Sequence, residues 1–477
     1  MPSFFRRINR FYSCRWRTCY ACTVALILLQ SLRVDISMAF VCMLKTPNRT
    51  NNENNFTRTN EHCSSLNNHK IMQHFEGEFE WSNTLQSNIL ACYFYGYIST
   101  NILAGILVNK YGGKKVLGSS LLFASFLTIL HPSLSRISGY LTIVLRILTG
   151  MVSAPMFPAI LSLMARWAPP SEKDLLIGIT FTGQVLGNIA GFVIFGYLCE
   201  YGFDNGWGSI FYTSGVTTLI FSFVWYYAVY DNPDLHPTIS QEEHAYLNRT
   251  IICERLPKNI PWRRMLSSPA IWAIVFGLFG YDWGSISLQV LLPLYLKEAL
   301  NVNATSNGII SSAPSVAEVI VLPLWGKLAD ILRSKNYMST HSVRVLFQTV
   351  ALVACASLLI TMGYLRCDQL IQIYIFLFLC GAFLAFSCSG VIANSIDIAP
   401  SYVGVIFGLT NTICASSGSF SSLFAKALTP NGTQSEWQIV FALYGAVLVL
   451  GAIFFAVLVR TEIQDWARPE GFEPEEA

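Results

Sequence analysis

Two arginines stand inside apolar stretches of the sequence. Arg33 lies midway through SLRVDISMAF, and Arg146 opens RILTGMVSAP. An unpaired charge at the centre of a bilayer costs at least about 2.5–3.5 kcal/mol, so such a residue is expected either to pair with an acid or to serve a function. A guanidinium group offers a planar fork of donors that matches a carboxylate. Arg33 therefore has two interpretations, an anion clamp or an ion pair that locks helices together.

Three acids lie in similar apolar surroundings and could carry a coupling proton. Asp35 follows Arg33 by two residues, which places the two side chains about 200° apart around one helix, so they are not expected to pair directly. Asp282 and Glu318 stand in later apolar runs. Each acid could titrate during function or could be a hydrogen-bonded structural group, and the sequence leaves both interpretations open.

The composition predicts an integral membrane protein. Of the 477 residues, 53% are hydrophobic and only 12% are charged, about half the charged share of soluble proteins. The net charge of +3 and the lack of a dominant basic block argue against a nucleic-acid partner. No His, Asp or Cys cluster has the spacing of a metal site or a nucleophile–base pair, so we expect no metal, no cofactor and no enzyme activity.

Hydropathy predicts an all-α protein that crosses the membrane twelve times. The first apolar run is too long for a signal-peptide core and is interpreted as a retained span. The predicted spans are 19–44, 85–108, 116–133, 139–163, 175–198, 208–229, 269–296, 307–328, 343–363, 369–394, 403–427 and 437–459.

Most of the Lys and Arg residues outside the spans fall on one side if the N-terminus is cytosolic, which places both ends of the chain in the cytosol. The predicted parts are a cytosolic arm 1–18, a six-helix half 19–229 with a non-cytosolic loop 45–84, a cytosolic loop 230–268, a second half 269–459 and an acidic tail 460–477. Four sequons lie in the non-cytosolic loops and are predicted glycosylation sites, whereas the cytosolic Asn248 is expected to stay unmodified. The four are Asn48, Asn55, Asn303 and Asn431.

The cysteines are expected to act mainly as small core residues. Cys42 belongs to this group because it lies in an apolar run. Cys63, Cys199 and Cys367 fall near one set of predicted loops, where a disulfide is compatible with the sequence but its pairing cannot be deduced.

The two halves share a loop motif. GILVNKYGGKK (105–115) follows the second span and GKLADILRSK (326–335) follows the eighth. Each begins with a glycine (Gly105, Gly326) that permits close helix contact, followed by a polar residue (Asn109, Asp330) that can cap a neighbouring helix, and then basic residues. Two six-helix halves with matching loops are typical of transporters that bind substrate at mid-membrane, so the pattern predicts the major facilitator fold.

The sequence also resembles one branch of that superfamily, the anion–cation symporters, which comprise sialin, the type I sodium–phosphate transporters and the vesicular glutamate transporters. The stretches that carry the resemblance are YGYISTNILAGILVNKYGGKK, RWAPPSEKD, LADILRSKNYMSTHSVR, DIAPSYVGVIFGLTNT and LTPNGTQSEWQIVF. The similarity runs over nearly the whole chain and implies that Arg33 binds substrate.

Departures from the family pattern bear on coupling and on substrate. The family's proton-carrying glutamate is replaced by Ser153, and Asp35 stands where the family usually has asparagine. The resemblance therefore makes the type I phosphate transporters, which also lack that glutamate, the closer guide to coupling. Leu90 and Tyr281 replace a histidine and an arginine of the glutamate carriers, which disfavours vesicular glutamate transport.

Three polar residues match positions that bind sugar acids in bacterial relatives. These are Tyr97, Gln184 and Asn411, which with Tyr281 are expected to shape the pocket beside Arg33, while Arg146 supports the first half electrostatically. Each of the three could instead form a hydrogen bond between helices.

The sequence therefore predicts a monomeric transporter of organic anions, such as sugar acids or urate-like anions, that works by alternating access in a lipid bilayer. The coupling ion is left open between Na⁺ and H⁺, with membrane potential alone as a third source. A sodium-coupled inorganic phosphate transporter is the nearest alternative, and a transporter-like receptor without transport activity belongs to another class. The tails contain no acidic di-leucine signal, which favours the plasma membrane over lysosomal or vesicular membranes.

Overall fold

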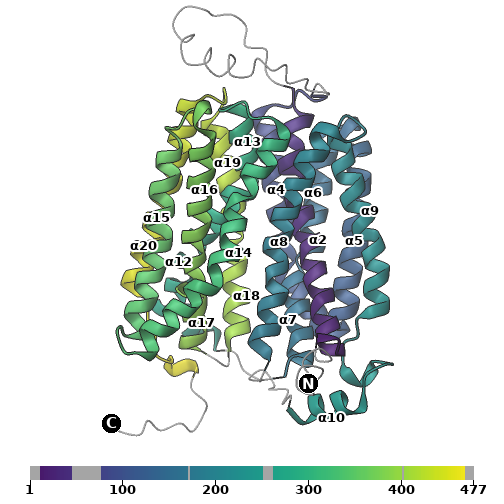
Figure 1. The fold of residues 1–477 in the computed structure, drawn as a ribbon, viewed down its shortest axis with the longest axis vertical. Helices are drawn as coiled ribbons and strands as arrows, with labels where there is room; N and C mark the ends of the chain where they lie inside the picture. Colours follow the sequence, from purple (N-terminus) through teal and green to yellow (C-terminus); the bar gives the residue numbers. More distant parts are fainter. Residues whose placement is uncertain (1–10, 46–76, 170–171, 251–260, 400–401, 468–477) are drawn as a thin grey trace, which may run out of the picture. The chain divides into compact units, whose positions relative to one another are not determined.

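The computed structural model describes residues 11–45, 77–169, 172–250, 261–399 and 402–467 (Figure 1). In these ranges the chain is helical and forms no strand, apart from one isolated bridge between Leu44 and Phe79. The prediction of an all-α membrane protein is confirmed. Eleven of the described helical segments are long and apolar enough to cross a membrane. The predicted span 403–427 is present as two shorter helices, α18 (Val403–Cys414) and α19 (Ser416–Leu428), which are separated at Ala415.

The chain divides into two compact units. Unit 1 contains residues 1–253 and 289–315, and unit 2 contains residues 254–288 and 316–477. The segment 289–315, which the sequence places in the second half, thus groups with the first six spans. The spanning helices of unit 1 are α2 (Cys14–Met43), α4 (Asn83–Tyr111), α5 (Gly113–Ile137), α6 (Gly139–Ser153), α7 (Met156–Trp167), α8 (Lys173–Tyr201) and α9 (Trp207–Ala228).

The remaining helices are distributed as follows. Unit 1 also contains α10 (Gln241–Thr250), which lies in the predicted cytosolic loop, and the short α13 (Leu292–Glu298). Unit 2 contains α11 (Trp262–Leu266), most of α12 (Pro269–Val290), the second part of α14 (Ala304–Ser334), α15 (Thr340–Met362), α16 (Leu370–Leu384), α17 (Val391–Ile398), α18, α19 and α20 (Gln434–Leu458).

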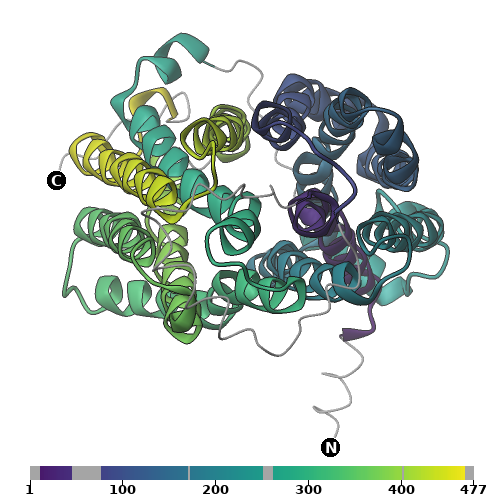
Figure 2. The ribbon, with the colours of Figure 1, turned by 90° about the horizontal axis from the view of Figure 1, so that it is seen from above.

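Within unit 1, helix α2 packs against α5, α7, α8 and α9 (Figure 2). Helices α4 and α6 cross through a pair of glycines. A Cβ atom at Gly96 would overlap the carbonyl oxygen of Ile147, and one at Gly150 would overlap the carbonyl oxygen of Tyr93. Small residues allow membrane helices to approach at backbone distance. This crossing brings the Tyr93 region of α4 against the α6 turn that carries Arg146.

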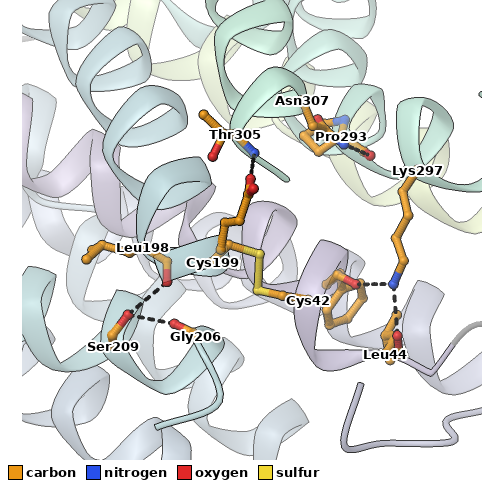
Figure 3. The surroundings of a disulfide bond; sticks show 12 residues. Cys42, Leu44, Leu198, Cys199, Gly206, Ser209, Pro293, Lys297, Thr305 and Asn307 are labelled. Atoms are coloured by element: carbon orange, nitrogen blue, oxygen red, sulfur yellow. Dashed lines mark hydrogen bonds between the residues drawn. A yellow bond between two sulfur atoms is a disulfide. The ribbon is translucent and has the colours of Figure 1, made fainter. Parts of the chain in front are cut away.

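A disulfide joins α2 to α8 at the predicted non-cytosolic end (Figure 3). Its cysteines are Cys42 and Cys199, so the expectation that Cys42 is a small core residue is wrong. Cys42 is partly exposed and Cys199 is buried. Apolar sequence around a cysteine does not show whether another thiol faces it across a helix crossing. Disulfides form in oxidising compartments, so this bond agrees with the predicted orientation. Cys63 and the side chain of Cys367 lie outside the described residues.

Removing the disulfide is expected to lower stability. The bond closes a sequence separation of 157 residues, and a native disulfide typically contributes about 2–4 kcal/mol. Cys42→Ala should therefore lower the thermal unfolding midpoint of the purified protein. A reductant should lower the midpoint of the wild type and leave that of Cys42→Ala unchanged. Equal midpoints for wild type and variant under oxidising conditions would contradict the prediction.

A charged cluster anchors the segment before α4 to the same end of unit 1. Arg136, at the end of α5, donates to Glu78 (2.8 Å from Nε to Oε1) and to Asp204 (2.8 Å from Nη2 to Oδ1). Glu78 also accepts from Asn205 (3.1 Å) and from the Trp207 indole (3.0 Å). Partial burial alone would raise the pKa of the Glu78 carboxyl, but these hydrogen bonds outweigh it and hold the pKa below its ordinary value.

This cluster predicts how stability depends on pH. Because folding lowers the pKa of Glu78, the carboxylate stabilises the fold at pH values above the ordinary glutamate pKa, and this is lost as pH falls through the lowered folded-state pKa. Glu78→Gln should lower stability by about 1 kcal/mol near neutral pH, since the groups are partly exposed. The difference in unfolding midpoint between wild type and variant should stay constant down to about pH 5 and shrink below about pH 4. A difference that grew on acidification would contradict this.

Unit 2 has an ion pair of its own, between a buried arginine and a partly exposed aspartate. Arg344 on α15 donates to Asp397 on α17 (2.7 Å) and to the Ser389 carbonyl (2.6 Å). On the same helix, Gln348 donates to the carbonyl of Gly277 in α12 (3.0 Å). These contacts, with the apolar side chains around Ile274 and Phe455, tie α12, α15, α17 and α20 together.

Candidate functional site

Arg33 lies in the middle of α2, against the aromatic face of α4. Its guanidinium carbon is 5.0 Å from the ring centroid of Phe94 and 5.9 Å from that of Tyr93. The side chain is partly exposed, and its Nε is buried without a hydrogen-bond partner. Among the described residues of unit 1, no carboxylate pairs with Arg33. The cation is thus held by ring faces, which attract it but do not neutralise its charge.

Arg146 lies close by on α6 and is neutralised. Its Nη1 donates to Asp35 on α2 at 2.9 Å, and its Nη2 donates to the Arg33 carbonyl at 3.3 Å. Arg146 is 2% exposed and Asp35 is 1% exposed. The pair therefore joins α2 to α6 inside the bilayer, where an isolated charge of either sign would be costly. The sequence leaves two interpretations of Asp35 open, a titrating acid or a hydrogen-bonded structural group. In the structure, the Asp35 carboxylate accepts a hydrogen bond from Arg146 on the neighbouring helix α6.

Tyr93 contacts both guanidinium groups. Its ring centroid lies 5.9 Å from the guanidinium carbon of Arg33 and 5.3 Å from that of Arg146. Tyr97, one turn further along α4, stacks on Tyr93 with centroids 6.4 Å apart. Tyr97 was a predicted pocket residue, and it lies beside the residue that contacts both arginines. The sequence analysis missed Tyr93 and Phe94, although the run CYFYGY places several aromatic rings on the helix turn that faces Arg33.

A polar group that the sequence analysis also missed lies one turn before Arg33 on α2. Gln30 donates to Asn188 on α8 (2.9 Å) and to Gln289 (3.1 Å), and its own oxygen is buried without a partner. Polar residues within apolar runs were a usable signal for both Gln30 and Asn188. Gln30, Asn188 and Arg33 therefore place several polar groups at about the same depth of unit 1.

Gln184 lies at a different level of α8. Gly191 of that helix packs against Val34, beside Arg33, so closely that a Cβ atom on the glycine would lie 2.8 Å from a methyl group of the valine. Gln184 precedes Gly191 by seven residues, or about 10 Å along the helix axis. Gln184 is partly exposed, and its side chain makes no hydrogen bond to the described residues. Its predicted role beside Arg33 therefore requires a substrate that reaches about two helical turns.

Ser153 ends α6 and is buried. Its hydroxyl donates to the Thr149 carbonyl of its own helix at 2.7 Å. The hydroxyl of Ser153 is therefore hydrogen-bonded within its own helix, and this position carries no carboxyl group.

The other predicted residues belong to unit 2. The hydroxyl of Tyr281 on α12 donates to Oε1 of Glu318 on α14 at 3.4 Å, and both side chains are partly exposed. Asp282 and Asn411 are partly exposed on α12 and α18. Within the described part of unit 2, no Lys or Arg pairs with Glu318.

The sequence pattern described as Major Facilitator Superfamily matches residues 70–423. Human sialin is 34% identical over 95% of this chain and 91% of its own length. The chain belongs to the sialin branch of the major facilitator superfamily. An uncharacterized transporter of Caenorhabditis elegans, slc-17.2, is 36% identical over 92% of this chain and 89% of its length. Bovine vesicular glutamate transporter 1 is 32% identical over 85% and 72%.

Solved structures show the same fold at low identity. A bacterial homologue of the lysosomal transporter Spinster matches with a TM-score of 0.68 at 12% identity, covering 94% of this chain and 97% of its own. A D-xylose–proton symporter matches with a TM-score of 0.66 at 16% identity, covering 94% and 99%. This member of the major facilitator superfamily is a multi-pass membrane transporter and not an enzyme. The described residues contain no group of three or more potential metal ligands.

The loop motifs of this transporter do not make the contacts expected of them. A Cβ atom at Gly105 or at Gly326 would meet nothing within 4 Å among the described residues, so neither glycine is at a close helix contact. Asn109 and Asp330 are exposed, and neither makes a capping bond within the described ranges. Instead, Asp231 caps α5 by accepting from the Lys114 amide at 2.8 Å. The capping group thus comes from the segment after α9, which places Asp231 beside the first turn of α5.

Two of the four predicted glycosylation sites are visible. Asn431 is exposed and bonds to Glu436 (2.8 Å), while Asn303 is partly exposed and accepts from the Ser306 amide (3.3 Å). Asn48 and Asn55 lie outside the described residues. Glycosylation at these asparagines stays a prediction.

Proposed function

We propose that this protein transports organic anions, including carboxylates such as sugar acids, by alternating access, and that Arg33 binds the anionic group. The observation that carries the proposal is the contrast between the two intramembrane arginines. Arg146 has a carboxylate partner at 2.9 Å, whereas Arg33 has none among the described residues of unit 1 and lies partly exposed on aromatic faces. A cation held without a counter-ion inside a bilayer is suited to an incoming anion.

The relatives support the same class of cargo. Sialin and the vesicular glutamate transporters are similar to this chain over most of its length, and the second name states an anionic amino acid. The aromatic residues beside Arg33 favour a carboxylate with a flat or ring-shaped body over bare inorganic phosphate, because Tyr93, Phe94 and Tyr97 offer apolar ring surface. No cofactor is needed for this function.

Uptake into proteoliposomes tests the proposal. The purified protein is expected to accumulate at least one of sialate, glucuronate, urate, glutamate or phosphate, each labelled and tested with and without sodium. Accumulation of phosphate alone, and only with sodium, would favour the phosphate transporter instead. Binding of an anion without accumulation would favour a receptor.

The energy source is expected to be membrane potential. Ser153 has no acidic proton to give, and Asp35 is held in an ion pair with Arg146. An inside-positive potential should therefore drive more anion uptake than an imposed pH gradient, because the moving anion carries charge. The measurement is initial uptake under a potassium–valinomycin potential and under a pH gradient, in the same vesicles.

Strong uptake driven by the pH gradient alone would contradict this prediction and would point to Glu318. In that case Glu318→Gln should remove the pH-driven component, because an amide cannot exchange a proton. Tyr281→Phe is the matched control, since it removes the hydrogen bond to Glu318 and keeps the carboxyl group.

A further inference from the structure

The spans of unit 1 carry very few charges away from the helix ends. In α2 and α4 to α9, the charged residues more than one turn from a helix end are Arg33, Asp35 and Arg146. The neighbouring titratable side chains are Tyr93 and Cys92 on α4, and His131 on α5, whose ring stacks on Phe211 at 4.3 Å and bonds to Ser135. Two positive charges and one negative charge leave this interior with a net charge of +1.

The single negative charge neutralises a particular arginine. The Asp35 carboxylate accepts from Arg146 at 2.9 Å and is buried, whereas Arg33 contacts the rings of Tyr93 and Phe94. Arg33 is therefore the cation left for a ligand. One ligand charge brings the interior to neutrality, whereas a second would leave an uncompensated negative charge in a medium of low dielectric constant.

We infer that this site selects anions of one negative charge, and that Asp35 sets this limit by neutralising Arg146. The inference rests on the proposed function and deepens it by naming the charge of the substrate. Asp35 acts here as a specificity-determining residue that touches no ligand, since its charge is felt through the arginine that it occupies.

A matched pair of ligands tests the inference. D-gluconate and D-glucarate share a six-carbon polyhydroxy chain, but at about pH 7 the first has one carboxylate and the second has two. Benzoate and terephthalate form a second pair with an aromatic body. Dissociation constants are measured by calorimetry on the full-length protein in nanodiscs, for wild type, Arg33→Gln, Asp35→Asn and the double variant Asp35→Asn/Arg146→Gln.

The wild type is expected to bind the monoanion of a pair about tenfold more tightly than the dianion. Asp35→Asn raises the interior charge to +2. The ratio of the two dissociation constants should then shift about tenfold toward the dianion, because the added positive charge attracts two ligand charges twice as strongly as one. Asparagine keeps an oxygen that can accept from Arg146. The double variant returns the net charge to +1 and should restore preference for the monoanion, which a merely structural role of Asp35 would not do.

The outcomes separate this inference from the proposed function. If wild type binds anions in an Arg33-dependent way but Asp35→Asn and the double variant show the wild-type ratio, or if wild type prefers dianions, the charge-limit inference is overturned and the proposed function stands. If no ligand of either pair binds to the wild type, or if Arg33→Gln binds these ligands as tightly as the wild type does, the proposed function fails and the inference fails with it.

Discussion

Arg33→Gln is expected to lower anion uptake at least about a hundredfold. The variant keeps a side chain of comparable length but loses the charge and the two-pronged donor, and hydrogen bonds to a charged group contribute about 1.5–3 kcal/mol each. The measurement is initial uptake in proteoliposomes at equal protein content. Arg33→Lys keeps the charge without the planar fork and should fall between wild type and Arg33→Gln.

The matched control is Arg249→Gln, which changes an exposed arginine on α10. That variant should transport at the wild-type rate. Wild-type uptake by Arg33→Gln would show that the anion is bound elsewhere.

Asp35→Ala is expected to lower the free energy of unfolding by about 3–5 kcal/mol, since it leaves Arg146 buried without its counter-ion. The measurement is the thermal unfolding midpoint, together with the fraction of monodisperse protein after detergent extraction. The double variant Asp35→Ala/Arg146→Met removes both charges and should recover most of the loss, because buried pairs are often replaced by apolar groups without net cost.

Ser153→Ala serves as the control for a buried change at the end of the same helix. Its hydroxyl bonds only to its own helix in the described contacts, so the expected loss is about 1 kcal/mol. A double variant as unstable as Asp35→Ala would indicate that the pair is not the source of the effect.

The spans and the placement of Arg33 within the bilayer could be predicted because both depend on local sequence. Hydropathy over about 20 residues identifies a helix that crosses the membrane, and a cation in its middle is visible directly. The break of the eleventh span at Ala415 was harder to predict, since neither α18 nor α19 contains proline.

Partnerships between helices were harder to predict. The bond from Arg146 to Asp35 depends on how α2 and α6 are rotated about their axes, which the α4–α6 glycine crossing and the α2–α8 packing set together. The same limit applies to the Cys42–Cys199 disulfide and to the role of Asp231 at the start of α5. Each of these joins residues that are far apart in sequence through tertiary contacts that no single segment encodes.

Tyr93 illustrates an intermediate case. Several aromatic residues surround Tyr93 in the sequence and indicate a helix face with many aromatic rings. Aromatic residues in a membrane span, however, usually serve to pack the protein core. Contact with both Arg33 and Arg146 distinguishes Tyr93 from the other aromatic residues in the described part of unit 1.

Direct binding to the purified transporter tests the central claim that Arg33 is an anion site. A ligand at one hundred times its dissociation constant stabilises a protein by about 2.7 kcal/mol. D-glucuronate, sialate and urate are titrated against wild type and Arg33→Gln, and the unfolding midpoint is followed. We predict that at least one anion raises the wild-type midpoint in a saturable way and leaves that of Arg33→Gln unchanged. An equal rise in both proteins, or no rise in the wild type with any organic anion, would contradict the claim.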